Sequence, residues 1–328
     1  MSSSIAAATQ ALLRRFRSRR PLRGGSVLVT IFGDAIAPRG GVVTLGSLIR
    51  LAHPFGLTER LVRTSVARLA QEGWLAGRRD GRQSEYRLTP NGQQRFAEAT
   101  RRIYGQSPAS WDRQWTLAVL PPAGKRRETL REELRWLGFG QVSAGVFAHP
   151  SSSLAQARQW LRSLEASNDV LLLSSSSEEL AVDRRLVAAG WDLAELARRY
   201  RRFVDAFKPI QAAVAPAAAR PGALASVPAP GALGAEAAFV IRTLLIHDYR
   251  KIHLQDPLLP PPLLPEDWIG STAYSLCSEL YGNVFAAAEG FLSGTASTLR
   301  DPLPPAELAA YARFGGIPAR ITGSAACR

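Results

Sequence analysis

The sequence predicts an α+β protein that begins and ends with helices and carries sheet structure between them. Helical periodicity dominates residues 26–72 and returns from residue 186 onward. Between these stretches, two short runs flank the Asp80-Gly81 pair, and apolar runs alternate with amphipathic stretches over residues 114–176. With 328 residues, the chain is long enough for two or three domains.

Residues 26–72 predict three helices in succession. The first covers residues 26–37 and stops at the PRGG segment, and the second is a short helix over residues 43–52. After the HPFG turn, Thr58 is a good N-cap for the third helix, and Gly73 is a good stop. Two helices joined by so short a turn are typical of a helix-turn-helix motif.

A β-hairpin is predicted directly after the third helix. The runs WLAGRR and RQSEYRL are separated by Asp80-Gly81, which is a strong local signal for a tight hairpin turn. A fourth helix then follows Thr89, which is a second N-cap, with Pro90 in its first turn. Helices followed by a two-stranded hairpin predict a winged helix-turn-helix domain over residues 25–105.

The third helix has an unusually one-sided outer face. At 100° per residue its apolar side chains fill one arc, and the opposite arc holds arginine, threonine, alanine and glutamine. Arginine can donate two hydrogen bonds to guanine, glutamine can bridge adenine, and threonine or alanine can contact a thymine methyl group. Arginines at the hairpin tip would reach phosphates or the minor groove. The candidate DNA-binding residues are therefore Arg60, Arg63, Thr64, Ala67, Arg68, Gln71, Arg78, Arg79 and Arg82.

Positive charge is concentrated in the first third of the chain, whose formal net charge overall is +14. Residues 1–105 hold 18 basic residues, all arginine, against 6 acidic ones, and residues 106–328 hold 23 against 21. A localised positive field indicates a polyanionic partner, either nucleic acid or an anionic membrane. A genome-wide preference for arginine would explain the residue type but not its position. Residues 1–24, which contain no acid, are predicted to be a flexible basic arm, with an organelle transit peptide as the alternative.

The sequence predicts a cytoplasmic protein. It has no run of 18 apolar residues, so no membrane span is expected. Its two cysteines, Cys277 and Cys327, form neither a disulfide framework nor a CxxC metal site, which suits a reducing compartment.

Two further regions follow the winged helix. Residues 106–185 predict a ferredoxin-like α+β domain, with strands at 114–122, 141–150 and 169–176, the last of them buried, and helices between them. Residues 186–328 predict a mostly helical effector and dimerisation domain, which contains an Ala/Pro/Gly tract at 212–238 that we expect to be a flexible loop.

Several long motifs resemble the PaaX family of bacterial phenylacetate-degradation repressors. They are VTIFGDAIAPRGG, LGSLIRL, GLTERLVRTSVARLAQEGWL, YRLT, RRIYG, ELRWLGFG and IRTLLIHDYRKIHLQDPLLPPPLLPEDWIG. The resemblance spans all three regions in the same order. It implies a cytoplasmic homodimeric repressor that binds a palindromic double-stranded DNA operator. It also implies release from that operator by an aryl-acyl-CoA such as phenylacetyl-CoA.

An acyl-CoA effector would need an apolar slot for its aryl group and cations for its phosphates. Arg242 and Arg250 are eight residues apart and thus near one helix face, and Trp268 follows in the Pro-rich segment. These three are the candidate effector-binding residues, although aromatic residues at helical spacing are usually part of a core.

Other chemistry is disfavoured by the residues present. His247 and His253 are six positions apart, so one straight helix face would not offer both to a metal. No GxSxG motif or cysteine motif supplies a nucleophile, and the chain has four histidines in all. We therefore expect no enzyme activity, no metal and no cofactor. The alternative function is a basic RNA-binding or architectural nucleic-acid-binding protein that responds to no small molecule.

Overall fold

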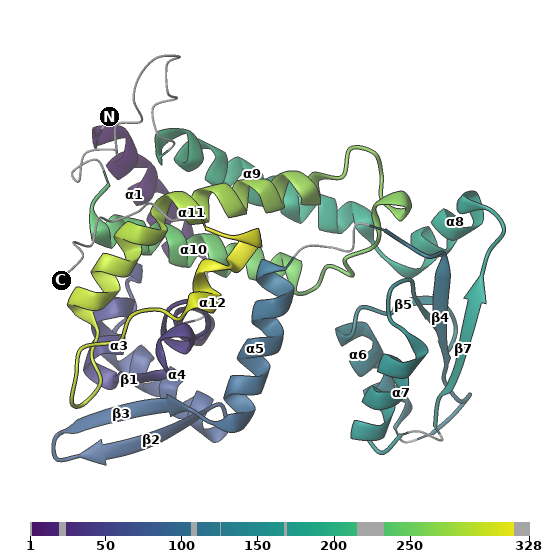
Figure 1. Cartoon of the computed structure of the whole chain (residues 1–328), viewed down its shortest axis with the longest axis horizontal. Helices are drawn as coiled ribbons and strands as arrows, with labels where there is room; N and C mark the ends of the chain where they lie inside the picture. Colours follow the sequence, from purple (N-terminus) through teal and green to yellow (C-terminus); the bar gives the residue numbers. More distant parts are fainter. Residues whose placement is uncertain are drawn as a thin grey trace, which may run out of the picture. The chain divides into compact units, whose positions relative to one another are not determined.

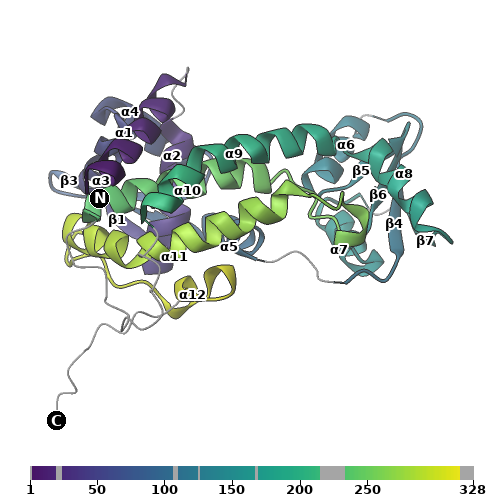
Figure 2. The same cartoon turned by 90° about the horizontal axis from the view of Figure 1, so that it is seen from above.

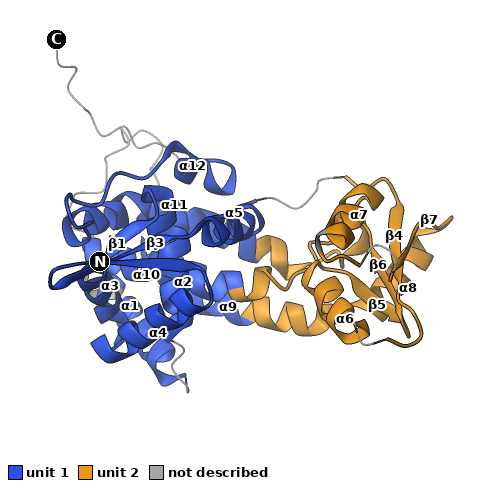
Figure 3. Cartoon of the chain, turned by 90° about the horizontal axis from the view of Figure 1, so that it is seen from below, with its two compact units in different colours: residues 1–105, 202–250, 273–328 blue, residues 106–201, 251–272 orange. Residues whose placement is uncertain are grey.

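The computed structural model describes residues 2–19, 24–105, 110–124, 126–166, 169–214 and 233–317. The chain forms two compact units (Figure 3). Unit 1 comprises residues 1–105, 202–250 and 273–328, and unit 2 comprises residues 106–201 and 251–272. The helical C-terminal region is therefore shared between the units, and the boundary expected at residues 185/186 falls inside unit 2. The α+β class is confirmed.

Unit 1 contains the predicted winged helix-turn-helix (Figure 1). Three antiparallel strands form a sheet in the order β1-β3-β2, and the β2–β3 hairpin is the wing. The short strand β1 was not predicted; it forms because Val42–Thr44 pairs with β3 and buries Val43. The elements are α2 (Gly24–Ile31), a π-helical turn η1 (Phe32–Ile36), η2 (Ala37–Arg39), β1 (Val42–Thr44), α3 (Leu45–Ala52), η3 (His53–Phe55), α4 (Glu59–Gln71), β2 (Leu75–Asp80), β3 (Gln83–Leu88) and α5 (Pro90–Tyr104).

The prediction that residues 1–24 are a flexible basic arm is wrong for most of that segment. Residues Ser2–Ser18 form helix α1, and the next residue, Arg19, forms an ion pair with Asp248. The helix forms because its apolar side chains fall on one stripe, which packs against the rest of unit 1. The buried members of that stripe are Ile5, Leu12, Leu13 and Phe16.

Long helices complete unit 1 and continue into unit 2. Figure 2 shows α9, α10 and α11 running alongside one another, and the Phe203–Tyr249 ring contact joins two of them. Of the predicted loop at 212–238, residues 215–232 lie outside the described part of the chain, and its ends belong to α9 and α10. The elements are α9 (Leu193–Val214), α10 (Ala235–His253), α11 (Ile269–Thr295), α12 (Leu308–Tyr311) and η5 (Arg313–Gly315).

Unit 2 has the predicted ferredoxin-like arrangement. Four antiparallel strands lie in the order β5-β6-β4-β7, so the first and third strands in sequence are central. The two helices α6 and α7 contribute to the core on one face, around Leu130, Phe147 and Leu161. The elements are β4 (Gln114–Val119), α6 (Arg127–Trp136), β5 (Gly140–Ser143), β6 (Val146–His149), α7 (Leu154–Ser163), β7 (Leu171–Ser176), α8 (Leu180–Gly190) and η4 (Pro261–Leu263).

Two details of unit 2 differ from the sequence prediction. The single strand expected at 141–150 is a hairpin of β5 and β6, because Gly145 adopts a positive φ of 82° and reverses the chain. Strand β7 is mostly exposed, because it is an edge strand with one neighbour, and Leu171 and Leu173 are 59% and 42% exposed. Among the helices of the described residues, none has the length and apolar character needed to span a bilayer.

Candidate nucleic-acid interface

Helix α4 is built as the second helix of the helix-turn-helix. The Thr58 side chain accepts a hydrogen bond from the backbone of Leu61, which satisfies a free N–H group at the helix start. Leu61 packs against α2 at Gly24, where a Cβ atom would lie 2.8 Å from its Cγ, so glycine permits the close approach. The buried face is Val62, Ser65, Val66 and Leu69, as the helical periodicity predicts.

The opposite face of α4 is open to solvent along its length. The hydroxyl group of Thr64 donates its proton to the carbonyl of Arg60 at 2.9 Å, so toward a base Thr64 offers its methyl group and an acceptor oxygen. All predicted reading residues of this helix are exposed, namely Arg60, Arg63, Thr64, Ala67, Arg68 and Gln71.

Two of the arginines on α4 are held by carboxylates one turn away. Arg63 donates from Nε and Nη2 to Oε1 of Glu59 at 2.9 and 2.5 Å, and Arg68 donates from Nε to Glu72 at 2.7 Å. Exposed pairs of this spacing contribute only about 0.3–0.5 kcal/mol, so DNA can displace them at little cost. Within the part of the chain that the structure describes, the Arg60 side chain has no hydrogen bond or ion pair.

The wing carries the remaining candidates. Strands β2 and β3 pair in register from Leu75↔Leu88 to Asp80↔Gln83, and Gly81 takes a positive φ of 55° in the turn. Arg79 donates from Nε to the carbonyl of Gly81 at 3.2 Å. The predicted wing residues Arg78, Arg79 and Arg82 are all exposed.

The segment after α11 fastens the helix-turn-helix to the C-terminal helices. The backbone N–H of Thr44 donates to the carbonyl of Ser297 at 3.0 Å, and the Ser297 N–H donates to Oγ of Ser47 at 3.0 Å. Glu85 on the wing accepts from the N–H of Leu299 at 2.8 Å. The start of α3 and the wing are thus both attached to the same C-terminal segment.

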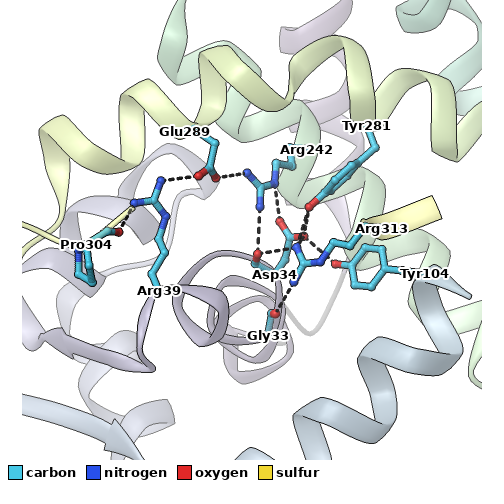
Figure 4. Close-up of polar contacts among 9 residues, drawn as sticks. All are labelled: Gly33, Asp34, Arg39, Tyr104, Arg242, Tyr281, Glu289, Pro304 and Arg313. Carbon is cyan, nitrogen blue, oxygen red and sulfur yellow. Dashed lines mark hydrogen bonds and ion pairs between the residues drawn. The ribbon is translucent and has the colours of Figure 1, made fainter. Parts of the chain in front are cut away.

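A buried charge cluster makes a second attachment (Figure 4). Asp34, in the π-helical turn, accepts from Arg242 Nε at 2.7 Å and from Arg313 Nη1 at 2.9 Å. Its Oδ1 also accepts from the hydroxyl groups of Tyr104 at 2.6 Å and Tyr281 at 2.8 Å. The cluster therefore joins the first helix of the winged domain to α5, α10, α11 and η5.

The cluster extends through a second carboxylate. Nη1 of Arg242 donates to Glu289 at 2.6 Å, and Glu289 also accepts from Arg39 at 2.5 Å. Arg39 in turn donates to the carbonyl of Pro304 at 2.5 Å. The cluster thus holds three buried arginines, Arg39, Arg242 and Arg313, against the carboxylates of Asp34 and Glu289. Each guanidinium group is bonded to a carboxylate, while Nε of Arg39 and of Arg313 has no hydrogen-bond partner among the described residues.

Burial alone would raise the pKa of Asp34, but the charges of Arg242 and Arg313 outweigh it and lower the pKa. Burial is also the main reason that the pKa of Tyr104 lies well above its ordinary value. At neutral pH the Asp34 carboxylate is therefore charged, and the hydroxyl groups of Tyr104 and Tyr281, whose pKa values are both raised, are neutral.

The structure corrects the predicted effector residues. Arg242 is fully buried, and each of its three nitrogens donates to Asp34 or Glu289. Arg250 donates to Thr30 and Ser26 on α2, and burial lowers its pKa to about 10, so it stays protonated at neutral pH. Both guanidinium groups are therefore engaged by groups of unit 1: Arg242 by two carboxylates and a backbone carbonyl, and Arg250 by α2.

The third candidate, Trp268, belongs to unit 2. It is half-buried and packs edge-to-face on Tyr200, with ring centroids 6.1 Å apart. Its role with an effector stays a prediction.

The two histidines discussed for a metal lie in separate environments. His247 is within 3.1 Å of the Thr30 hydroxyl group, and His253 is within 3.0 Å of the Tyr200 hydroxyl group. Across the residues that the structure describes, His, Cys, Asp and Glu side chains form no group of three or more that could hold a metal.

Sequence reasoning missed Asp34, Glu289 and Arg313. An aspartate inside the apolar run VTIFGDAIA was the one local signal. Its side-chain partners lie between 70 and 279 positions away in the sequence, so no local pattern could identify them.

Comparison with known proteins covers most of the chain. Residues 23–92 match the model of PaaX-like proteins, residues 108–187 the central Cas2-like domain of PaaX proteins, and residues 191–294 the PaaX-like C-terminal domain. The chain is 35% identical over 304 residues to the transcriptional repressor PaaX of Escherichia coli (strain K12), which covers 90% of this chain and 92% of that protein. Among solved structures, it is similar to the uncharacterized protein Rv0674 from Mycobacterium tuberculosis. That match has 21% identity and a TM-score of 0.45, over 74% of this chain and 89% of the other.

Proposed function

The chain belongs to the PaaX family, and from this premise we propose that it is a transcriptional repressor of an aromatic-acid catabolic operon of the phenylacetate type. The observation that carries the proposal is the outer face of α4. Every predicted base-reading residue is exposed there, and the apolar residues behind it are buried or half-buried. The wing adds three exposed arginines.

We propose that α4 enters the major groove and that the wing contacts the adjacent backbone. Arg60, Arg63 and Gln71 then donate to base edges, while the methyl groups of Thr64 and Ala67 meet thymine. Arg78, Arg79 and Arg82 bind phosphates or the minor groove, which positions the domain without reading sequence.

The functional form is proposed to be a homodimer on a palindromic operator. One recognition helix contacts only a few base pairs, which is too little to select a site in a genome. Two copies related by a twofold axis would present two α4 helices to half-sites about one DNA turn apart.

The proposed inducer is an aryl-acyl-CoA such as phenylacetyl-CoA, acting on a cytoplasmic protein that catalyses no reaction. The protein would leave its operator when the thioester binds. The attachments of the winged domain to α10, α11 and η5 support this proposal, because a ligand that shifts those helices also shifts the DNA-reading elements.

A fluorescence-anisotropy titration tests the proposal. The DNA is the region upstream of the protein's own gene, and the competitor is a scrambled duplex of the same composition. We expect sequence-specific binding that phenylacetyl-CoA relieves and that neither free phenylacetate nor acetyl-CoA relieves. Binding that ignores both the DNA sequence and the thioester would instead support the architectural or RNA-binding function.

Glu59 is expected to contribute to sequence discrimination. Glu59→Gln removes the carboxylate that holds both Nε and Nη2 of Arg63 in the free protein, so the Arg63 side chain is less ordered before DNA displaces the pair. We expect the ratio of operator affinity to scrambled-DNA affinity to fall roughly threefold. This corresponds to the small free energy of one exposed ion pair on a helix together with the lost orientation of the Arg63 side chain. Titrations with the two duplexes measure this ratio.

The matched control is Glu72→Gln, which removes the same charge from the C-cap of the same helix, at the Arg68 pair. Both changes reduce repulsion from phosphates and should raise affinity for any duplex. An equal effect of the two variants on the ratio would show that Glu59 acts only through its charge.

A further inference from the structure

Helix α1 lies outside the segment that matches the family model, which starts at residue 23. Its buried stripe contains Leu12, Leu13 and Phe16, all at most 6% exposed. The helix is therefore an integral part of unit 1, and its role is not explained by the DNA contacts proposed for α4 and the wing.

The last turn of α1 contacts the turn of the helix-turn-helix. The ring of Phe16 packs edge-to-face on Phe55, with centroids 6.2 Å apart. Arg17 donates from Nη2 to the carbonyl of Pro54 at 2.7 Å. Gly56 has a positive φ of 76°, and a Cβ atom there would lie 3.1 Å from Nε of Arg17. The contacts thus reach three consecutive residues between α3 and α4.

The same end of α1 also contacts α10. Phe16 packs edge-to-face on the ring of His247, with centroids 5.7 Å apart. Arg19 forms a two-pronged bond with Asp248, at 2.6 Å between Nη1 and Oδ1 and 2.7 Å between Nη2 and Oδ2. This bond raises the pKa of Arg19, and Asp248 is only 12% exposed, so the pair is partly shielded from water.

Phe16 is therefore shared between two elements that the recognition helix depends on. The turn from His53 to Gly56 sets the angle between α3 and α4, and α4 begins at Glu59, three residues later. Phe55 also contacts Phe239 of α10 directly, with centroids 5.9 Å apart. The aromatic rings of α1, the turn and α10 form one packed group.

We infer that α1 is a positioning element for DNA recognition, in which Phe16, Arg17 and Arg19 hold the helix-turn-helix turn against α10. This inference rests on the proposed function, because it supposes that α4 reads DNA. It adds that the orientation of α4 depends on an N-terminal helix that contacts no base. Loosening α1 would leave the exposed face of α4 intact but let its angle vary.

Charge reversal at the ion pair tests the inference. Arg19→Asp and Asp248→Arg should each weaken operator binding, roughly three- to tenfold, and the double swap should restore it, because the pair re-forms with opposite polarity. Arg14→Asp is the matched control, an exposed arginine of the same helix that changes the net charge equally. If the double swap binds no better than the single variants, or Arg14→Asp weakens binding as much as Arg19→Asp, the positioning role is wrong.

Hydrogen exchange separates failure of this inference from failure of the proposed function, since it needs no DNA. Phe16→Ala should speed exchange of the Gly56 amide, which donates to the carbonyl of His53 at 2.9 Å, and Arg14→Ala should leave it unchanged. Unchanged exchange at Gly56 in Phe16→Ala would overturn the inference even if the protein binds its operator. Absence of operator binding by the wild-type protein would overturn the proposed function and leave the exchange result standing.

Discussion

Asp34→Ala is expected to lower the free energy of unfolding by about 3–5 kcal/mol, the cost of leaving buried charges without their partner. Asp34 is buried and is bonded to both Arg242 and Arg313. Among the residues that the structure describes, its removal leaves Arg313 without a carboxylate partner and leaves Arg242 with Glu289 alone. The hydroxyl groups of Tyr104 and Tyr281 lose their acceptor as well.

Urea denaturation followed by circular dichroism measures this loss, with the exposed Asp267→Ala as the control. The control should change the free energy of unfolding by less than about 0.5 kcal/mol, as surface substitutions usually do. An Asp34→Ala variant as stable as the control would show that the cluster does not hold the winged domain to the C-terminal helices.

Asp34 also determines how the stability of the protein changes with pH in the acidic range. The pKa of Asp34 is lower in the folded state than in the unfolded state. The contribution of the ionised carboxylate to the free energy of unfolding is therefore complete above the unfolded pKa of about 3.9, and it is lost as the pH falls through the lower folded pKa. Asp34→Asn cannot titrate, so its stability should depend less on pH in that acidic range than the wild-type stability does.

Arg63→Ala is expected to weaken binding at the preferred operator by about 1–3 kcal/mol and to relax discrimination at one base position. The reason is that a guanidinium group on the exposed face of α4 can form two hydrogen bonds with guanine, which alanine cannot replace. Titrations against operators with single base changes measure both effects.

Arg79→Ala on the wing is the comparison for that variant. It should weaken binding to all sequences by a similar factor and reduce the slope of log affinity against log salt by about one phosphate contact. If the two variants gave the same sequence profile and the same salt slope, the division between base reading on α4 and backbone contact on the wing would be wrong.

The helix-turn-helix and its wing could be predicted because their signals are local. The side chain of Thr58 caps α4 by accepting a hydrogen bond from the N–H of Leu61. Around the Asp80-Gly81 turn, β2 and β3 pair in the register that a tight hairpin requires. The 3.6-residue period placed Val62, Val66 and Leu69 inside and the reading residues outside. None of these features depends on a distant part of the chain.

Other features depend on distant partners and were missed for that reason. Val42–Thr44 is a strand only because β3 pairs with it, and Arg242 binds carboxylates instead of a ligand because α10 faces Asp34 and Glu289. The arginine-rich composition of α1 indicated an unstructured arm, but the apolar stripe from Ile5 to Phe16 is buried against other parts of unit 1.

The central claim, that the exposed face of α4 reads a DNA sequence, is tested most directly by selection from a randomised duplex library. The wild-type protein and the Arg60→Ala/Arg63→Ala double variant are each used to select bound duplexes, which are then sequenced. We predict that the wild-type protein enriches an inverted repeat with half-sites about one DNA turn apart, and that the double variant still retains DNA but loses the repeat. Enrichment of the same repeat by both proteins, or of none by the wild-type protein, would contradict the claim.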